Sequence, residues 1–344
     1  MILFFIFILG LIFISFKSVR GYNENYLSFD ITNAIKGVFI LLVFISHANP
    51  YIKQAGYDYG SYGDTLYLKI ISCIGQWIVT LFLFYSGYGV MESVKRKGYY
   101  YIVSFPRKRI LPLLINFDIA VSLYIILDLL LNKPITLEQS LLSFIAWDSV
   151  GNSNWYIFVI LVCYIVTYGI FSISMHCFGE SQFNIGYYNH ALIITVLLLV
   201  TMAVLSYFKD EYWYDTILCY SAGCLFSIKK TEVFELTKKY YKSVFLGLVI
   251  LLCCIPLIPI YAKGLTLNAF NIVFALLVVV ISMKFRVKNR FIMWLGQNLF
   301  PIYIYQRVGN DNIIFNWGWG NSSNVSNSVC YCLFRCNVTN CKRL

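Results

Sequence analysis

Apolar stretches long enough to cross a lipid bilayer recur from one end of this chain to the other. A transmembrane helix needs about 20 predominantly apolar residues. Charged residues make up only 12 % of the sequence, whereas a soluble domain carries roughly 25 %. Such a chain cannot cover a water-exposed surface with polar groups, which excludes a soluble globular protein, a disordered chain and a coiled coil. The pattern predicts an all-α, polytopic transmembrane helical bundle.

We expect about ten membrane-spanning helices. The first has no positive charge before its apolar run and no small-residue cleavage site after it, which favours an uncleaved helix over a signal peptide. The ten predicted spans are Met1–Phe16, Ala34–Tyr51, Lys69–Met91, Ile110–Leu131, Trp155–Ser174, Ala191–Phe208, Thr216–Ile228, Ser243–Tyr261, Leu265–Met283 and Phe291–Gln306.

Lysine and arginine cluster in alternate loops between these spans, and cytoplasmic loops of membrane proteins carry an excess of both residues. With the N-terminus outside, the inside loops hold Lys17, Arg20, Lys36, Lys95, Arg96, Lys97, Arg107, Lys108, Arg109, Lys229, Lys230, Lys238, Lys239, Lys242, Lys284, Arg286, Lys288 and Arg290. The inside loop around Gly179–Tyr188 is the exception, because it has neither residue. The net charge of +11 therefore indicates orientation in a membrane and no nucleic-acid partner.

The chain divides into three parts: the first helix (1–16), a membrane domain (34–306) and a polar tail rich in Asn and Cys (308–344). Three interpretations of the tail stay open: a shifted reading frame, a genuine polar tail outside the membrane, and a thiolate metal site. The spacing of its cysteines is not a standard zinc spacing, so we predict no metal. The longest outside loops, Ile52–Leu68 and Asn132–Asn154, are rich in Tyr, Gly and Asn and are expected to contribute to a binding surface.

The second predicted span carries a cation, Lys36, and a histidine, His47. About eleven residues of α-helix make three turns plus about 20°, so the two side chains share one face, about 16.5 Å apart along the axis. Lys36 lies at the inner interface, either as a snorkelling residue or as part of a site. His47 lies in the outer half, either in an interhelical hydrogen bond or as a general base. The pair suits a donor whose charged end stays inside while its reactive end reaches into the membrane.

Two aspartates fall in the fourth predicted span. An ionisable residue inside a span costs about 2.5–3.5 kcal/mol on insertion scales, so each needs a reason. Three roles fit Asp118, the deeper one: an ion pair with Lys36, orientation of the His47 imidazole, or a hydrogen bond in the bundle interior. Asp128 lies near the outer end, where we expect it to be solvated.

Three adjacent cations, Arg107, Lys108 and Arg109, stand at the inner mouth of the same span. Guanidinium forks match phosphate oxygens, so the three residues can bind phosphates. They can equally orient the helix or attract anionic lipid headgroups. No P-loop, dinucleotide fingerprint or metal-ligand spacing accompanies them.

Four segments together resemble the membrane acyltransferase-3 family of integral-membrane O-acyltransferases. The stretch from Lys36 to His47 is similar to that family's arginine-x10-histidine signature, and Phe82–Tyr88 resembles the Phe-rich, Ser-Gly-Tyr end of its next helix. Phe105–Pro112 resembles the basic stretch that opens the following helix, and Asn154–Tyr156 the Trp-Tyr start of a later span. The segments occur in family order between Asn33 and Tyr156.

The resemblance implies a multi-pass enzyme of the plasma (inner) membrane. It would move an acetyl or short acyl group from acyl-CoA, on the cytoplasmic side, to a hydroxyl, typically of a cell-envelope glycan, without a metal. His47 would be the catalytic base, and Lys36 would replace the family's arginine in catalysis and donor binding. The CoA phosphates would meet Arg107, Lys108 and Arg109; the residues expected to support the site are Asp118, Trp155 and Tyr156.

Two other functions fit the same residues. A non-catalytic transporter or flippase of glycan or lipid intermediates would release no CoA, and His47→Ala would alter transport instead of chemistry. An inactive family member with a disrupted C-terminus is the second alternative. It is suggested by the polar tail after Arg307, where members of the family normally continue with another apolar helix.

Overall fold

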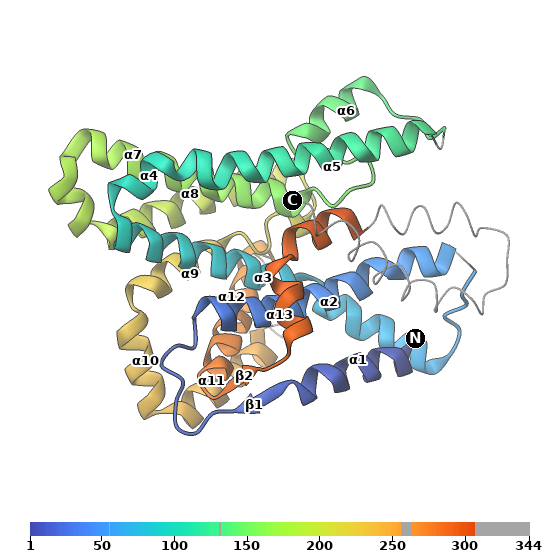
Figure 1. Cartoon of the computed structure of the whole chain (residues 1–344), viewed down its shortest axis with the longest axis horizontal. Helices are drawn as coiled ribbons and strands as arrows, with labels where there is room; N and C mark the ends of the chain where they lie inside the picture. Colours follow the sequence, from blue (N-terminus) through green and yellow to red (C-terminus); the bar gives the residue numbers. More distant parts are fainter. Residues whose placement is uncertain (55, 131, 256–262, 307–344) are drawn as a thin grey trace. The chain divides into compact units, whose positions relative to one another are not determined.

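The computed structural model describes residues 1–54, 56–130, 132–255 and 263–306, and most of them are helical (Figure 1). The described chain forms two compact units. The first comprises Met1–Ser15, Asn33–Gly75 and the residues from Lys288 onward; the second comprises Phe16–Thr32 and Gln76–Val287. Each unit is described by itself.

The first unit contains α1 (Ile2–Ile14), most of α2 (Phe29–Gln54), the beginning of α3 (Tyr62–Lys97) and α13 (Arg290–Gln297). A helical stretch over 299–306 follows α13 after a turn at Asn298. The second unit begins with β1 (Phe16–Ser18), holds the rest of α3 and ends with β2 (Phe285–Val287). Between them it contains α4 (Tyr99–Phe105), the π-helix η1 (Pro106–Ile110), α5 (Leu111–Leu130), α6 (Leu137–Phe144), α7 (Trp155–Ile185), α8 (Tyr187–Phe208), the 3-10 turn η2 (Glu211–Trp213), α9 (Leu218–Ile228), α10 (Lys230–Lys239), α11 (Tyr241–Cys254) and α12 (Lys263–Ser282).

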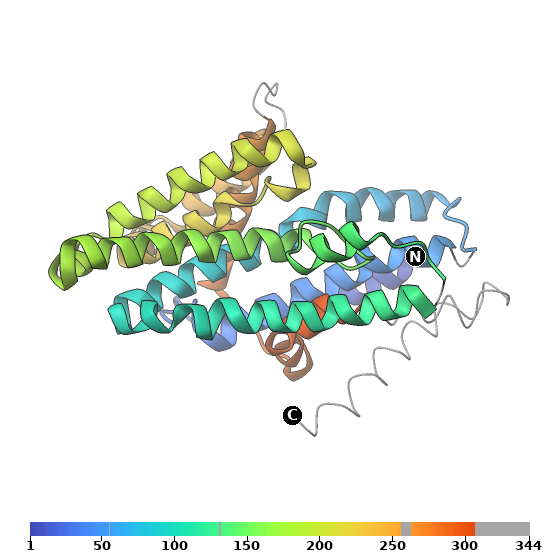
Figure 2. The same ribbon diagram turned by 90° about the horizontal axis from the view of Figure 1, so that it is seen from above.

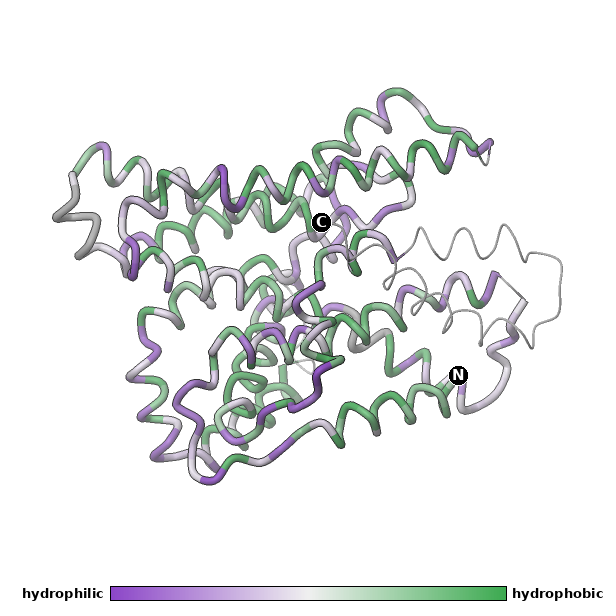
Figure 3. Tube along the Cα trace, in the orientation of Figure 1, coloured by the Kyte–Doolittle hydropathy of each residue, from purple (hydrophilic) through white to green (hydrophobic). Residues whose placement is uncertain are grey.

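Six helical segments of the described chain are long and apolar enough to cross a membrane, which agrees with the predicted helical membrane bundle. They are Phe29–Gln54, Tyr62–Lys97, Tyr99–Leu130, Trp155–Gly179, Tyr187–Phe208 and Lys263–Ser282, and α1 and α11 are shorter apolar helices. Figure 3 shows apolar residues along these helices and polar residues gathered in the connections. The seventh predicted span corresponds to α9, which has only 11 residues. The count of ten spans and the outside N-terminus stay predictions.

The outer faces of α5 and α8 are apolar and exposed, as membrane helices require. In α5 the exposed side chains include Leu111, Ile115, Ile119 and Leu123, spaced four residues apart along one stripe. The opposite side of α5 buries Phe117, Val121 and Tyr124. An apolar helix face that packs against no other part of the protein is unfavourable in water, so this side of the helix is suited to contact lipid. In Figure 2 the segment from α4 to α5 forms one long rod.

A pair of glycines lets α3 and α9 cross at backbone contact in the second unit. A Cβ added to Gly87 would collide with the carbonyl oxygen of Tyr220, and one added to Gly223 would collide with that of Phe84. The Sγ atom of Cys224 donates to the carbonyl oxygen of Gly87 at 3.4 Å. Small residues at a helix interface allow this close approach, which is a common means of association in membranes.

The first unit contains the same arrangement between α2 and α13. A Cβ on Gly37 would collide with the carbonyl oxygen of Ile292, and a Cβ on Gly296 would collide with that of Asn33. The N-terminal half of α2 therefore packs directly on the backbone of α13.

Two short strands join distant parts of the second unit. In the antiparallel pair β1–β2, Lys17 stands opposite Arg286. Beside them, the Nζ atom of Lys284 donates to the carbonyl oxygen of Gly21 at 2.9 Å and lies 3.8 Å from the centroid of the Tyr22 ring. The pairing agrees with the assignment of both basic segments to one side of the membrane.

The prediction that Asp128 is solvated is wrong. Its side chain is buried, and the Nζ atom of Lys133 lies 3.0 Å from Oδ1. Asn132 adopts a left-handed backbone conformation with φ 52°, and the backbone N–H of Lys133 donates to the carbonyl oxygen of Asp128 at 2.9 Å. The chain therefore turns back at the end of α5, and Lys133 covers the carboxylate.

Candidate functional site

His47 and Lys36 lie on one uninterrupted helix, because α2 runs from Phe29 to Gln54. Regular helix geometry therefore places both side chains on one face, as their spacing predicts. Both side chains are half-buried. Pro50 follows His47 inside the same helix. This face of α2 belongs to the first unit, as does the helical stretch 299–306.

The Nδ1 atom of His47 lies 2.8 Å from the Nε2 atom of Gln306. The His47 ring also stands against Tyr303, with ring centroids 6.2 Å apart. The helical stretch 299–306 therefore holds one side of the imidazole. The sequence alone does not lead to a role for Gln306. The feature that points to it is a polar amide side chain at the end of the apolar segment Phe291–Gln306.

The hydrogen bonds of Gln306 determine the tautomer of His47. Its Nε2 atom also donates to the carbonyl oxygen of Tyr303 at 2.9 Å. A carbonyl oxygen only accepts, so this bond decides which end of the amide faces the imidazole. The amide N–H thus donates to Nδ1, which carries no proton, and the neutral ring carries its proton on Nε2.

Replacing Gln306 by glutamate is expected to move the His47 proton to Nδ1. A carboxylate can only accept, so it favours a protonated Nδ1 where the amide favours a bare one. The measurement is 15N NMR of histidine-labelled protein, in which the chain's 3 histidines are assigned by substitution. Gln306→Leu, which neither donates nor accepts, should give a mixture of tautomers. An unchanged bare Nδ1 in Gln306→Glu would show that the amide does not control the ring.

The basic stretch lies on a local distortion of a long helix in the second unit. Between α4 and α5 the backbone makes one π-helical turn, Pro106–Ile110, which carries Arg107, Lys108 and Arg109. Pro106 has no N–H, so the regular hydrogen-bond pattern is interrupted where the turn begins. Isolated π-turns within α-helices occur frequently at functional sites. All three cationic side chains are exposed.

Arg109 differs from its two neighbours because its side chain is held in place. Its Nε atom donates to the hydroxyl of Tyr101 at 3.2 Å. The Tyr101 ring contacts the ring of Phe105 edge-on, with centroids 5.5 Å apart. Among the described residues, no carboxylate forms an ion pair with Arg107, Lys108 or Arg109. The stretch therefore presents uncompensated positive charge, which attracts anions.

Helix α7 joins three of the segments that carry the family resemblance. It begins with Trp155 and Tyr156, and the Tyr156 ring contacts Phe82 of α3 with centroids 6.1 Å apart. Two turns later, the hydroxyl of Tyr164 lies 3.2 Å from Oγ of Ser86. The Tyr164 ring also contacts Phe105, with centroids 5.4 Å apart. In the second unit these motif residues therefore pack against one another.

The two other residues expected to support the site have different surroundings. Asp118 is half-buried in α5, and its Oδ1 atom accepts no hydrogen bond from the described residues. Since Asp118 lies in the second unit and Lys36 and His47 in the first, its roles toward them stay predictions. Trp155 contacts Tyr212 edge-on, with centroids 6.0 Å apart, so it packs on the segment that follows α8.

Within the part of the chain that the structure describes, no group of three or more His, Cys, Asp or Glu side chains could hold a metal ion. The cysteines of the predicted tail, Cys330, Cys332, Cys336 and Cys341, lie outside the described residues.

Comparison with known proteins gives one match. A family model described as an acyltransferase domain, that of the acyltransferase-3 family, matches residues 30–334. No curated protein and no solved structure matches the chain. The matched range includes all four segments named above and extends beyond Arg307. Because it covers most of the sequence, the chain belongs to the acyltransferase-3 family and is a multi-pass membrane protein.

Proposed function

We propose that this acyltransferase moves an acetyl or short acyl group from acyl-CoA to a hydroxyl. The acceptor is a cell-envelope glycan, and the enzyme lies in the plasma (inner) membrane. Membership of the family indicates acyl transfer and a membrane location. The donor, the acceptor and the roles of individual residues are the proposal.

The donor binds through its phosphates at the basic stretch. CoA is anionic, and an uncompensated patch of Arg107, Lys108 and Arg109 raises its local concentration. Arginine forks bind phosphate oxygens in pairs. The hydrogen bond that Arg109 donates to Tyr101 reduces the freedom that the arginine side chain loses on binding. Lys36 contributes a point charge where relatives of the family have an arginine.

His47 acts as the general base. The acceptor hydroxyl oxygen attacks the thioester carbonyl while His47 takes the hydroxyl proton. The tetrahedral intermediate then expels the CoA thiolate, which receives that proton, and the ester and free CoA leave. The imidazole becomes positively charged only as it takes the proton. It therefore stabilises the negative charge that develops on the thioester carbonyl oxygen in the transition state and not in the ground state.

The hydrogen bond between Gln306 and Nδ1 must break before His47 can take the hydroxyl proton. With the proton on Nε2 and an amide N–H on Nδ1, neither nitrogen offers an uncommitted lone pair to an acceptor. The acceptor hydroxyl displaces the amide from Nδ1. The freed Nδ1 lone pair then takes the hydroxyl proton, while Nε2 keeps its own.

The observation that carries the proposal is a membrane histidine held at Nδ1 by a side chain 259 residues away, in a chain of an acyltransferase family. The test is release of free CoA thiol by proteoliposomes given acetyl-CoA and a glycan extract. We expect release that requires both the protein and the extract. A protein that moves glycan across the bilayer without releasing CoA would be a carrier, and the proposal would fail.

Neutralising the basic stretch is expected to raise the KM for acetyl-CoA about 10- to 100-fold in the Arg107→Gln/Lys108→Gln/Arg109→Gln variant. Each exposed charge contact contributes roughly 0.5–1 kcal/mol, and salt screens it. The KM of the wild type should therefore rise with ionic strength and that of the variant should not. The matched control is Lys238→Gln/Lys239→Gln/Lys242→Gln, which removes the same charge from other exposed positions. An equal effect in both variants would contradict a specific phosphate site.

A further inference from the structure

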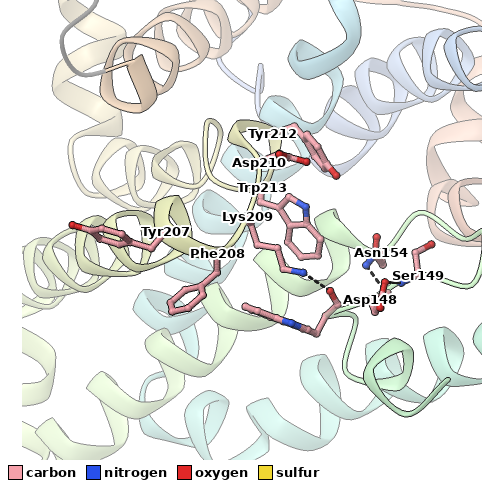
Figure 4. A pocket seen from close by; sticks show the side chains of 10 residues that line it. Asp148, Ser149, Asn154, Tyr207, Phe208, Lys209, Asp210, Tyr212 and Trp213 are labelled. Atoms are coloured by element: carbon pink, nitrogen blue, oxygen red, sulfur yellow. Dashed lines mark hydrogen bonds between the residues drawn. The ribbon is translucent and has the colours of Figure 1, made fainter. Parts of the chain in front are cut away.

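A pocket of about 530 Å³ lies in the second unit, between two segments that are far apart in the sequence. One segment connects α6 to α7 and contributes residues from Trp147 to Asn154. The other runs from the end of α8 into η2 and contributes residues from Tyr207 to Trp213. Figure 4 shows Lys209 reaching from the second segment toward the first. None of the roles proposed above uses this pocket.

Hydrogen bonds hold the first segment in a defined conformation. The Nδ2 atom of Asn154 donates to the carbonyl oxygens of Ala146 and Asp148, at 3.1 and 2.8 Å. The Nε2 atom of Gln139 donates to the carbonyl oxygen of Ser149 at 2.8 Å. Ala146 is fully buried and has φ 59°, in the left-handed region that an alanine rarely adopts. Strained backbone of this kind persists where the surroundings hold it, and it concentrates at binding sites.

Lys209 joins the two segments. Its ammonium lies 4.1 Å from the centroid of the Trp147 ring and 4.4 Å from that of Trp213, and it donates to the carbonyl oxygen of Trp147 at 2.7 Å. Burial lowers the pKa of Lys209, and the nearby Asp148 and Asp210 oppose this shift. Because Lys209 already lies against both indoles, a cationic ligand would be repelled there.

The remaining polar groups favour a neutral ligand that donates hydrogen bonds. The pocket holds two carboxylates, Asp148 and Asp210, against the one ammonium, so its net charge is unfavourable for phosphates. Among the described residues, the carboxylate of Asp148 accepts only the N–H of Ser149, at 2.7 Å, and no hydrogen bond or ion pair involves the carboxylate of Asp210. The exposed ring of Tyr212, 41 % accessible, adds an apolar surface with a polar tip.

These features match the chemistry of a sugar ring. A pyranose presents apolar C–H groups that pack on an aromatic ring and hydroxyls that donate to carboxylates. A few placed polar groups in a largely aromatic pocket are the usual means of orienting such a ligand. The pocket lies beside the start of α7, and Tyr164, ten residues after Asn154, contacts Phe105, which directly precedes the basic stretch. About 15 Å of helix therefore separates the pocket from that contact.

We propose that the pocket between Trp147–Asn154 and Tyr207–Trp213 binds a neutral sugar unit, through the carboxylates of Asp148 and Asp210 and the ring of Tyr212. The role of this pocket as the subsite for the acyl acceptor rests on the proposed function. A donor bound at the basic stretch and a glycan bound here would lie at two different places along α7.

The test is saturation-transfer NMR on the full chain in nanodiscs that contain no glycosidic detergent. The probes are maltotetraose and tetra-N-acetylchitotetraose as neutral sugars and glucose 1-phosphate as an anion. We expect saturation of the ring protons of at least one neutral sugar. Asp210→Asn and Tyr212→Ala should each weaken binding at least about 5-fold, and Asp148→Asn should do the same if its loop stays folded.

Two variants serve as matched controls: Glu138→Gln, an exposed carboxylate on α6, and Tyr62→Ala, an exposed tyrosine of the first unit. Both should bind the sugar as the wild type does. No saturation of either neutral sugar, unchanged binding in both Asp210→Asn and Tyr212→Ala, or tighter binding of glucose 1-phosphate would overturn the proposal. The assay contains no acyl donor. Sugar binding without acyl transfer would therefore refute only the proposed reaction, and acyl transfer without sugar binding would refute only the pocket.

Discussion

Replacing His47 by asparagine is expected to lower the rate of acyl transfer by about 10²- to 10⁴-fold. This is the range that a positioned general base contributes. The loss should appear in kcat and leave the KM for acetyl-CoA nearly unchanged, because the base acts on the acceptor hydroxyl in the transition state. Initial rates of ester formation in proteoliposomes over a range of acetyl-CoA concentrations separate the two constants.

The matched control is His176→Asn, which changes the same residue type at an exposed position of α7 in the second unit. It should retain the rate of the wild type. Equal thermal stability of the two variants would show that the loss is chemical and not a failure to fold. A His47→Asn enzyme within about 3-fold of the wild-type rate would contradict the assignment of the base.

Adding one methyl group at Gly87 is expected to destabilise the protein, whereas the same change two residues later is not. In Gly87→Ala the new Cβ meets the carbonyl oxygen of Tyr220, a backbone atom that cannot move without shifting α9. Overpacking of this kind costs about 1–3 kcal/mol and sometimes more. Gly89 has no atom within 4 Å of an added Cβ, so Gly89→Ala should gain up to about 1 kcal/mol of helix propensity.

Thermal unfolding of the two variants in one detergent measures the difference, and the two melting temperatures should move in opposite directions. Gly37→Ala tests the equivalent contact of α2 with the carbonyl oxygen of Ile292 in the first unit and should resemble Gly87→Ala. Equal stabilities of Gly87→Ala and Gly89→Ala would show that α3 and α9 do not cross at backbone contact.

Features that depend on local composition could be predicted from the sequence. Apolar length identified the helices that are long enough to cross a membrane, because the cost of exposing a polar backbone to lipid acts on each segment separately. Helix periodicity placed Lys36 and His47 on one face, and α2 has the regular geometry that this requires. The family followed from four short segments in order, and the family match includes all of them.

Features that depend on contacts between distant segments could not be predicted. The bond from Gln306 to His47 links residues 259 positions apart, and hydropathy describes neither partner's surroundings. The glycine pairs also depend on such contacts: Gly87 looks like a motif residue in the sequence, but the backbone of Tyr220 on a second helix leaves no room for a side chain there. The burial of Asp128 depends on the turn at Asn132, which returns Lys133 to it and is not visible in an apolar pattern.

Acyl transfer and the role of His47 are tested together by the transfer of radiolabelled acetyl from acetyl-CoA to a glycan and lipid extract by membranes that contain the full chain. The wild type, His47→Asn and His176→Asn are compared at equal amounts of folded protein. We expect labelled ester with the wild type and His176→Asn and almost none with His47→Asn. Equal labelling by all three proteins would contradict the role of His47, and labelling by none of them would contradict acyl transfer from acetyl-CoA.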